Sequence, residues 1–360
     1  MLKYKKKSVL DIQLGGVSLV DKALFAKQLS VMLHSGLPLI EALDIASQSS
    51  RSKLSGVLRG VSESVMSGHT LADSFSRYPK IFSGLFVSAT RAGELSGTLV
   101  GNLENISVQL EKEKDLIAKV KGALVYPVVI LIATFILGMI LSFVILPKIT
   151  PLFEGLRVEL PTTTKALIAF SHFIENNGLI FFLSIIVFFT FTIWLVRQSF
   201  TKPFTHWFLL HTPIIGRITM NANLARFSRT LGMLLKSGLR IDESLEITEN
   251  TVGNFYYARA LKRVSRNIRS GSKLSDNLAT FNNLFPVLAT RMIQVGEESG
   301  QFEKTLFYLA SYYEDEVDTA TKALSTAIEP LLLLFIGLVV GFLALSIITP
   351  IYDITGNIQR

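Results

Sequence analysis

Three long stretches without a single charged residue constrain this chain more than any other feature of its sequence. They read VVILIATFILGMILSFVIL at residues 128–146, LIFFLSIIVFFTFTIWLV at residues 179–196 and LLLLFIGLVVGFLALSIIT at residues 331–349. A helix needs about 20 apolar residues to cross the hydrocarbon core of a bilayer, and each stretch reaches that length with its flanks. A buried helix of similar length in a soluble protein would carry polar positions on one face. We therefore predict three transmembrane helices.

The composition agrees with a membrane protein and excludes several kinds of chemistry. Hydrophobic residues make up 49% of the chain and charged residues 18%, compared with roughly 25% charged residues in ordinary soluble domains. The chain contains no cysteine, which excludes disulfides, cysteine-ligated metal centres and thiol nucleophiles. The net charge of +8 has three ordinary explanations, which are nucleic-acid binding, an anionic membrane surface and membrane topology.

The positions of Lys and Arg decide between those explanations. Of the 36 such residues, 16 lie in residues 1–123, 16 in residues 197–326, three in residues 147–178 and one in residues 350–360. Cytoplasmic segments of membrane proteins carry the excess of Lys and Arg. We therefore predict that the two large segments face the cytoplasm, and that the loop and the C-terminal tail face outward. The large segments also hold 11 and 12 acidic residues, so the sequence favours contact with membrane lipids over direct binding of nucleic acid.

The first 20 residues form a basic lead-in. They open with Lys3, Lys5, Lys6 and Lys7, but polar and acidic residues then interrupt the apolar core that a signal peptide would need. Two interpretations stay open. The segment either lies near the membrane surface or is a disordered, solubilising tail.

The two large segments repeat one another. Residues 25–45 read FAKQLSVMLHSGLPLIEALDI, and residues 227–247 read FSRTLGMLLKSGLRIDESLEI. After one inserted residue the match continues into the membrane, where Pro127 corresponds to Pro330. Self-similarity of this kind marks a duplicated structural unit. We therefore predict that each unit is a cytoplasmic domain with its following transmembrane helix, and that the second transmembrane helix returns the chain to the cytoplasm.

Each repeated unit reads as a bundle of short helices. Phe25, Leu29 and Leu33 recur every four residues, as do their equivalents in the second unit, and this spacing lines one face of a helix. Gly36 and Gly238 follow at places where a helix should end, because glycine readily takes the left-handed conformation of a helix C-cap. No segment shows the alternating pattern of a β-strand.

The predicted fold is an all-α membrane protein with two homologous cytoplasmic helical-bundle domains and three transmembrane helices. In chain order, the predicted segments are a basic N-terminal segment (1–20), the first cytoplasmic domain (21–123), a transmembrane helix (124–146), an outward loop (147–178), a second transmembrane helix (179–196), the second cytoplasmic domain (197–326), a third transmembrane helix (327–349) and an outward tail (350–360).

No catalytic motif is present in the sequence. There is no Gly-Lys dipeptide and hence no Walker A phosphate loop, and neither H-E-x-x-H nor G-x-S-x-G occurs. The five histidines do not pair at helical spacing. We therefore expect no enzymatic activity, no cofactor and no metal site. A transporter would need ionisable groups or broken helices within the membrane, and the three apolar stretches contain no charge.

One acidic motif occurs at the same place in both units. It reads Gly93-Glu94-Leu95-Ser96-Gly97 in the first unit and Gly296-Glu297-Glu298-Ser299-Gly300 in the second. In one interpretation the glycines form a tight turn between helices, and the glutamate caps the next helix by accepting backbone N–H groups. In the other interpretation Glu94 and Glu297 engage a basic surface on a partner protein or on the other unit.

The membrane segments carry further candidate residues. Glu329 and Pro330 stand just before the third apolar stretch, and we expect Glu329 at the headgroup level near a helix start, where the helix dipole favours an anion. Helix packing or partner contact is the alternative for Glu329. Gly138 lies in a run of small residues at four-residue spacing, and Gly337-x-x-x-Gly341 is a GxxxG motif. Small residues let membrane helices approach closely, so we expect these glycines to support helix association.

Taken in order, these motifs resemble one known family. Both units begin with F-x-x-x-L-x-x-x-L-x-S-G-L, both contain G-E-x-S-G, and the first and third spans are entered through Tyr126-Pro127 and Glu329-Pro330. From about residue 21 to residue 353 the chain therefore resembles the type II secretion F and type IV pilus platform proteins.

The resemblance implies a scaffold in the inner membrane of a bacterial cell. Such platforms are thought to contact pilin or pseudopilin subunits in the membrane and to dock a cytoplasmic hexameric assembly or retraction ATPase, whose motion drives subunit insertion. The resemblance also implies contacts with other inner-membrane components of the machine and a homo-oligomer. The alternative is a membrane transporter or receptor component unrelated to pili.

Overall fold

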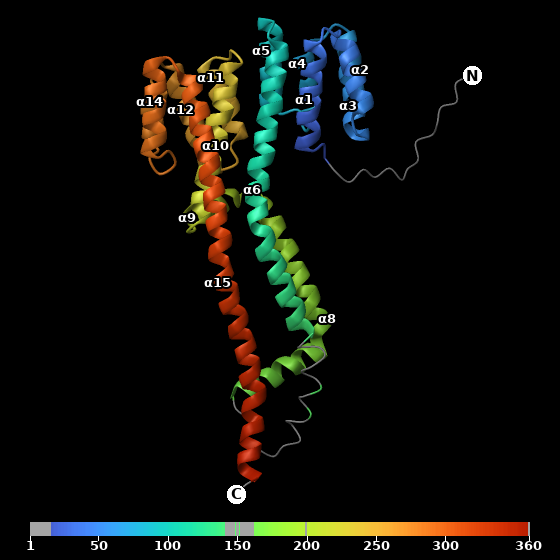
Figure 1. Cartoon of the computed structure of the whole chain (residues 1–360), viewed down its shortest axis with the longest axis vertical. Coiled ribbons are helices and arrows are strands. Elements are labelled where there is room, and N and C mark those ends of the chain that lie inside the picture. The colour runs from blue at the N-terminus through green and yellow to red at the C-terminus, as the bar shows by residue number, and fades with distance from the viewer. Residues whose placement is uncertain (1–15, 141–147, 149–150, 152–161, 199, 359–360) are drawn as a thin grey trace, which may run out of the picture. The chain divides into compact units, whose positions relative to one another are not determined.

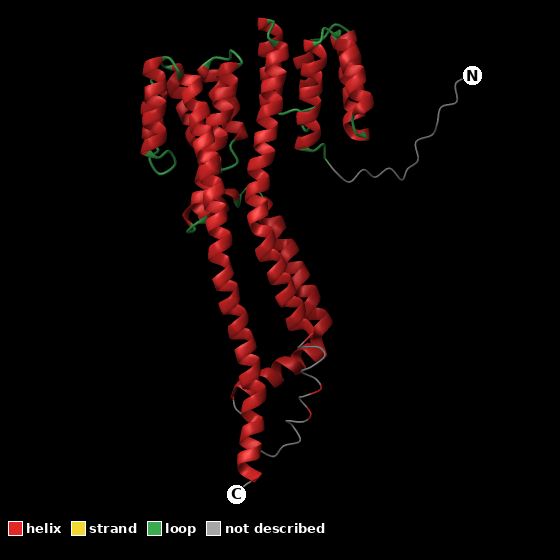
Figure 2. Ribbon diagram, in the orientation of Figure 1, coloured by secondary structure: helices red, strands yellow, loops and turns green. Residues whose placement is uncertain are grey.

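The computed structural model describes residues 16–140, 148, 151, 162–198 and 200–358 (Figure 1). Every regular element within these ranges is a helix (Figure 2), which confirms the predicted all-α fold class. Most of the basic lead-in, the end of the first predicted transmembrane helix and the first part of the outward loop lie outside the described residues.

The chain builds one six-helix module twice, and we call the two modules copy 1 and copy 2. Copy 1 consists of α1 (Leu19–His34), α2 (Leu39–Ser49), α3 (Ser52–Met66), α4 (Leu71–Ser76), α5 (Gly84–Ser96) and the first part of α6 (Leu99–Ile140). Copy 2 consists of α10 (Ile215–Lys236), α11 (Ile241–Thr251), α12 (Phe255–Arg269), α13 (Leu274–Ala279), α14 (Val287–Ser299) and the first part of α15 (Phe302–Ile358). The chain between the copies contains α8 (Thr162–Arg197) and α9 (Lys202–His211). From α2 to α5, the helix bounds correspond residue for residue to those of copy 2, and the inserted residue of copy 2 lies between α11 and α12.

Three glycines in each copy allow the chain to leave its helices sharply. Gly36, Gly68 and Gly97 follow α1, α3 and α5 with φ values of 85°, 90° and 74°. The equivalent glycines of copy 2 share this conformation: Gly238, Gly271 and Gly300. Only glycine enters this left-handed region without steric cost, so the shared glycines explain why the two copies have the same helix bounds.

Copy 1 is built around four phenylalanine rings. Phe25, Phe75, Phe82 and Phe86 are each at most 1% exposed, and the centroids of neighbouring rings lie 4.4–6.3 Å apart. Burying one such side chain contributes about 1.5–3 kcal/mol. The ring cluster is therefore a main source of stability for copy 1.

Copy 2 fills the equivalent space differently. Phe227 and Phe285 occupy two of the four phenylalanine positions, with ring centroids 5.4 Å apart. Tyr257 of α12 packs against Phe285, also at 5.4 Å, and its hydroxyl donates to the Leu284 carbonyl oxygen at 2.6 Å. Burial raises the pKa of the Tyr257 phenol far above its usual range. One buried, hydrogen-bonded tyrosine thus takes part of the place of the phenylalanine cluster.

The chain divides into two compact units. The first comprises Met1–Ala118 with Arg217–Val317, and so contains both copies of the module. The second comprises Lys119–Gly216 with Asp318–Arg360. α6 and α15 each begin in the first unit and continue in the second.

Among the described residues, three helices are long and apolar enough to cross a membrane: Leu99–Ile140, Asn176–Val196 and Phe302–Phe342. They correspond in order to the three transmembrane helices predicted from the sequence. No helix begins at residue 124 or at residue 327, however, because α6 and α15 run unbroken from the module into the apolar stretch. Part of the predicted outward loop is also helical, since α8 starts at Thr162 and leaves helical geometry at Asn177.

The short helix α9 carries several exposed aromatic side chains. Phe204, Trp207 and Phe208 are 72%, 47% and 56% exposed, and the Trp207 ring stacks on His211 at 4.4 Å. Amphipathic rings of this kind are enriched at the surface of membranes, which agrees with the position of α9 directly after the second apolar helix.

Candidate functional site

Glu94 lies near the end of α5 and reaches the start of α4. Its Oε1 accepts the backbone N–H of Leu71 at 2.6 Å, and its Oε2 accepts that of Ala72 at 2.9 Å. The first N–H groups of a helix have no partner within that helix, and a negative charge is favourable at a helix N-terminus. Both oxygens of the half-buried carboxylate are therefore engaged by α4.

Glu297 makes the same two contacts in copy 2. Its Oε1 accepts the N–H of Leu274 at 2.7 Å, and its Oε2 accepts that of Ser275 at 2.9 Å. The N-cap residues of the two short helices differ. Thr70 accepts a third backbone N–H, from Asp73 at 3.1 Å, whereas the lysine at the equivalent position of copy 2 makes no side-chain cap. The start of α13 therefore depends more on its glutamate than the start of α4 does.

Gly93 and Gly296 precede these glutamates where two helices approach closely. A Cβ atom on Gly93 would lie 2.8 Å from the Cα of Leu99, and a Cβ atom on Gly296 would lie 3.0 Å from the Cβ of Thr305. Inserting atoms into such a contact forces the helices apart. Space, rather than backbone conformation, thus requires glycine at both positions.

The interpretation of the motif as a turn between helices with a capping carboxylate is correct for Gly97 and for the kind of contact that Glu94 makes, and wrong for Gly93 and for which helix is capped. Gly93 and Glu94 lie inside α5, and the chain turns at Gly97, which has left-handed geometry. The carboxylate caps α4, which precedes it in the chain. The first N–H groups of α4 have no partner within the helix, and Glu94 reaches them because α5 packs against α4.

Within the first unit, copy 1 and copy 2 contact each other through α6 and α10. The Gln109 amide donates to the Thr230 hydroxyl at 3.3 Å, and the Lys236 ammonium donates to the Asn105 side-chain oxygen at 3.0 Å. Two ion pairs also join the copies, between Glu113 and Arg226 at 3.6 Å and between Lys112 and Glu314 at 3.7 Å. The α6 residues recur every four positions, so one face of α6 forms this contact.

Apolar side chains of copy 2 complete the core of copy 1. Met233, Leu234 and Leu239 are 2%, 0% and 9% exposed and belong to the hydrophobic cluster of copy 1. Ile247 of α11 and Phe307 of α15 pack against the same cluster. The two copies therefore share one core, and neither copy buries its apolar surface alone.

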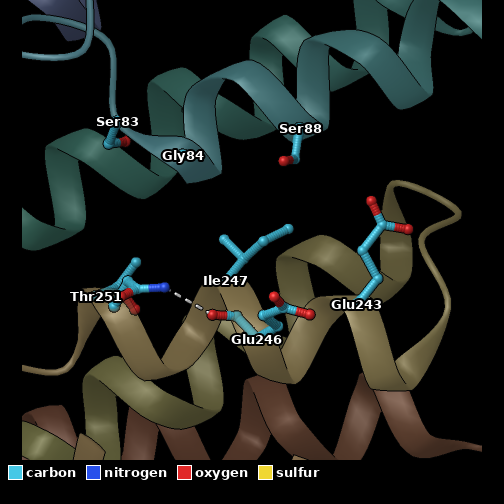
Figure 3. Close-up of a pocket in the computed structure, with 8 residues that line it drawn as sticks. Ser83, Gly84, Ser88, Glu243, Glu246, Ile247 and Thr251 are labelled. Carbon is cyan, nitrogen blue, oxygen red and sulfur yellow. Dashed lines mark hydrogen bonds between the residues drawn. The ribbon is translucent and has the colours of Figure 1, made fainter. Parts of the chain in front are cut away.

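An open pocket of about 410 Å³ lies where α5 meets α11 (Figure 3). Its lining comes from the start of α5 and from one face of α11: Ser83, Gly84, Ser88, Glu243, Glu246, Ile247, Asn250 and Thr251. Figure 3 shows Ile247 standing between the two helices, with Glu243 and Glu246 on the α11 side. The pocket is thus a gap in the contact between the copies. Small side chains line its wall on α5, and acidic side chains line its wall on α11.

No other helix among the described residues packs closely against the candidate glycines of the membrane helices. A Cβ atom on Gly138, Gly337 or Gly341 would meet nothing within 4 Å, so their role in helix association stays a prediction. Glu329 is exposed and lies inside α15. The expectation of a helix start at Glu329 was therefore wrong, and the dipole argument does not apply to it. Pro127 and Pro330 likewise lie inside α6 and α15.

These observations define a class of protein. The described part of the chain contains no group of three or more His, Asp or Glu side chains that could hold a metal ion. What repeats instead is a six-helix module, its glutamate caps and a last helix that continues as an apolar span. The chain is thus a duplicated, all-α membrane protein that presents helical surfaces.

Comparison with known families places the chain within that class. The model of the type II secretion system protein F family matches residues 25–147 and 227–350, which is one match for each copy with its apolar helix. The chain belongs to this family.

Curated relatives cover nearly the whole chain. The type IV pilus assembly protein PilC of Myxococcus xanthus is 35% identical over 99% of this chain and 87% of its own length. PilC of Thermus thermophilus is 34% identical over 96% of this chain and 85% of its own length. The type II secretion system protein F of Aeromonas hydrophila is 31% identical over 96% of this chain and 89% of its own length. The family resemblance seen in the sequence is therefore confirmed.

Sequence reasoning missed the contact between the copies. The repeat located equivalent positions, but not which of them face the other copy. Gln109 and Thr230 are buried polar residues, 5% and 1% exposed. Only a structure shows that these residues bind each other.

Proposed function

We propose that this chain is the inner-membrane platform of a type IV pilus or type II secretion machine, and that it couples a cytoplasmic assembly ATPase to the insertion of pilin or pseudopilin subunits into a fibre. The names of the relatives support a role in pilus assembly or secretion. The observation that carries the coupling is the continuity of α6 and α15 between the module and the membrane.

A continuous helix is a stiff connection. α6 has 42 residues, or about 60 Å at 1.5 Å per residue. Its first part is fixed in copy 1, where Leu103, Ile106 and Leu110 are at most 5% exposed. A force that turns or shifts copy 1 is therefore transmitted along α6 as far as Pro127, which lies inside the helix at the start of the apolar stretch and removes one of its backbone hydrogen bonds. α15 offers copy 2 the same connection.

The stiffness of α6 is tested by replacing residues 119–122 with Gly-Ser-Gly-Ser. The matched control replaces the same four residues with alanine, which also removes the Lys119–Asp318 ion pair at 3.9 Å but keeps the helix. In cells that assemble the fibre, we expect both variants to reach the membrane and to bind the ATPase. Only the alanine variant should assemble fibres at a normal level. Normal assembly by the glycine–serine variant would refute coupling through α6.

We further propose that the ATPase docks on copy 2, through α12. Five cations on α12 are exposed: Arg259, Lys262, Arg263, Arg266 and Arg269. The equivalent helix α3 of copy 1 carries only Lys53 and Arg59. Such a difference between duplicated helices marks a surface with its own partner, and a cationic face favours an acidic one. In this proposal Glu94 and Glu297 are structural caps, and the basic face of α12 replaces them as the docking surface.

Charge reversal separates the two helices. Lys262→Glu with Arg263→Glu should abolish capture of the purified ATPase by the detergent-solubilised chain, and fibre assembly with it. Arg59→Glu in copy 1 is the control and should leave capture unchanged. Equal loss in both variants would assign the effect to general charge, and no loss in either would remove α12 from the proposal.

The proposal requires both copies to face the cytoplasm. Because the chain has no cysteine, single cysteines report topology cleanly. Thr163→Cys and Asn357→Cys should react with a membrane-impermeant maleimide in intact cells whose outer membrane, if present, has been permeabilised. Ser55→Cys should react only after lysis. Labelling of Ser55→Cys in intact cells, with Thr163→Cys protected, would reverse the orientation.

We also infer that the chain acts without enzymatic activity of its own. The reason is the absence of any catalytic motif in the sequence. ATP hydrolysis by the purified chain that tracked its own point variants would contradict this inference.

A further inference from the structure

We propose that the contact between copy 1 and copy 2 is repeated between chains, so that α14 and α15 of one chain pack on α1 and α2 of a second copy of the same chain. The contact inside the chain joins the two final helices of copy 1, α5 and α6, to the two first helices of copy 2, α10 and α11, and Phe307 and Glu314 on one face of α15 also touch copy 1. The equivalent final helices of copy 2 and first helices of copy 1 are left without that contact.

The first helices of copy 1 show what is missing. Val31 of α1 is 58% exposed, whereas Met233 at the equivalent position of α10 is 2% exposed because it is buried against copy 1. Ile45 of α2 is 42% exposed, whereas its equivalent Ile247 packs on the core of copy 1. Two positions that the internal contact buries are thus apolar and open to solvent in copy 1, whereas Met32 and Leu37, the equivalents of Leu234 and Leu239, pack partly on the core of copy 1 itself.

The final helices of copy 2 show the complementary surface. Asn105 of α6 binds α10, and its equivalent on α15 is Tyr308, which is 61% exposed. Gly84 lines the contact with α11, and its equivalent on α14 is Val287, which is 71% exposed. An exposed tyrosine and valine on the matching face fit the exposed valine and isoleucine of α1 and α2.

The occupant of both faces follows from the repeat itself. The free surface of α1 and α2 is equivalent to that of α10 and α11, and the free surface of α14 and α15 is equivalent to that of α5 and α6. Since α5 and α6 bind α10 and α11 within the chain, a second copy of this chain carries the surface that each free one would bind. The contact is heterologous, because different surfaces of the two chains meet. A first pairing leaves one free face at each end, so further contacts of the same kind either close the assembly into a ring or, where the rotation does not close, extend it.

The charges predict that this contact is weaker than the internal one. Inside the chain, Lys112 lies 3.7 Å from Glu314. In the contact between chains, Asp315 of copy 2 takes the place of Lys112, and Glu111 from copy 1 of the next chain takes the place of Glu314. Both residues are exposed. Two carboxylates replace an ion pair and repel each other. Asp315→Lys recreates the attractive pair and should strengthen association, an outcome that general damage to the fold does not produce.

Cysteine cross-linking in membranes tests the contact directly. Gln109 and Thr230 touch inside the chain, and their equivalents are Tyr312 and Gln28. Gln28→Cys and Tyr312→Cys, placed on chains with different tags and expressed together, should form a mixed cross-linked dimer. Neither variant alone should cross-link well, because a heterologous contact does not bring a residue against itself. The double variant Gln28→Cys, Tyr312→Cys should be cross-linked through both faces of each chain, as a closed ring or as longer species.

Three controls make the outcome decisive. Gln109→Cys with Thr230→Cys should close within a single chain and confirms that the reagent spans the distance. Asp315→Lys should raise the yield of mixed dimer several-fold, and Val31→Glu, at an exposed position, should lower it several-fold without changing the thermal stability of the chain. The proposal is overturned if the mixed pair stays uncross-linked while the internal control closes, or if Gln28→Cys cross-links to itself as well as it does to Tyr312→Cys.

Discussion

Copy 1 packs Phe75 and Phe86 beside Leu54, whereas copy 2 has Leu278 and Ala289 at the first two positions and Tyr257 at the third. All six side chains are at most 2% exposed. Volume lost at two positions of copy 2 is thus partly regained at another, as close packing requires. The backbone features do not vary in this way, since the three left-handed glycines and the capping glutamate occur in both copies.

The same comparison explains a second exchange. In copy 1 the Ile81 carbonyl oxygen accepts the Lys22 ammonium at 3.1 Å, and in copy 2 the equivalent Leu284 oxygen accepts the Tyr257 hydroxyl. Leu224 stands where copy 1 has Lys22. One carbonyl group is therefore satisfied by different donors from different helices. The comparison teaches that the fold fixes which backbone groups need a partner, and leaves open which side chain supplies it.

The largest expected effect comes from breaking the ring cluster of copy 1. Phe86→Ala should lower the free energy of unfolding by about 3–5 kcal/mol, because it leaves a cavity among three other rings. Adding Leu54→Tyr to Phe86→Ala imports the arrangement of copy 2 and should recover part of that loss. Urea unfolding of the detergent-solubilised chain, followed by protease susceptibility, measures both. If adding Leu54→Tyr lowers the free energy of unfolding further, the tyrosine of copy 2 does not fill the space that Phe86 fills in copy 1.

The next effect separates two glycines that look equivalent in sequence. In both copies an added methyl group meets the helix that follows. At Gly93 it would lie 2.8 Å from the Cα of Leu99, whereas at Gly296 the nearest backbone atom, the Cα of Phe302, lies 3.3 Å away and the Cβ of Thr305 3.0 Å away. Neither a Cα nor a Cβ atom can turn aside by a side-chain rotation, so both variants should lose stability. The closer backbone contact makes Gly93→Ala the costlier variant, at about 1–3 kcal/mol. The same unfolding measurement decides this. Equal losses would mean that the helices around Gly93 shift as easily as those around Gly296.

A smaller effect follows from the exchanged carbonyl donors. Lys22→Leu leaves the part-buried Ile81 oxygen without its donor, which costs about 1–3 kcal/mol. Leu54→Tyr supplies the hydroxyl that copy 2 uses, so the double variant should be more stable than the sum of the single effects predicts. Burial lowers the pKa of Lys22 in the folded chain. Between that lowered pKa and the ordinary lysine pKa, the unfolded chain binds more protons than the folded chain does. The free energy of unfolding therefore rises with pH in that window. Lys22→Leu should remove this rise, and additive single effects would contradict the exchange.

The sequence predicted a large part of this structure, and for identifiable reasons. The apolar stretches and the repeat depend on many residues each, so the three membrane-length helices and the duplicated helical module were predicted correctly. The glycines at positions 36 and 238 were recognised because their effect on the backbone is local. The helix that Glu94 caps was not predicted, because the contact joins residues 23 positions apart. The contact between the copies was missed for the same reason, since it depends on how separate helices pack.

The smallest effect concerns the helix caps, where the two copies differ by one side chain. Glu94→Gln keeps the size of the side chain but turns one acceptor oxygen into an N–H donor that faces a helix N–H. The cost should be on the order of 1 kcal/mol. Glu297→Gln should cost more, because Thr70 still caps α4 while Lys273 gives α13 no side-chain cap.

Lys273→Thr supplies the missing cap, at the loss of only an exposed contact with Glu298 at 3.9 Å. It should stabilise the chain by about 0.5–1 kcal/mol and reduce the cost of Glu297→Gln toward that of Glu94→Gln. Denaturation midpoints of the four variants give the answer, and fibre assembly measured beside them separates structure from docking. If the glutamates act only as caps, assembly declines in step with stability. Loss of assembly in Glu94→Gln with an unchanged midpoint would return Glu94 to the docking surface, against the assignment made from its hydrogen bonds.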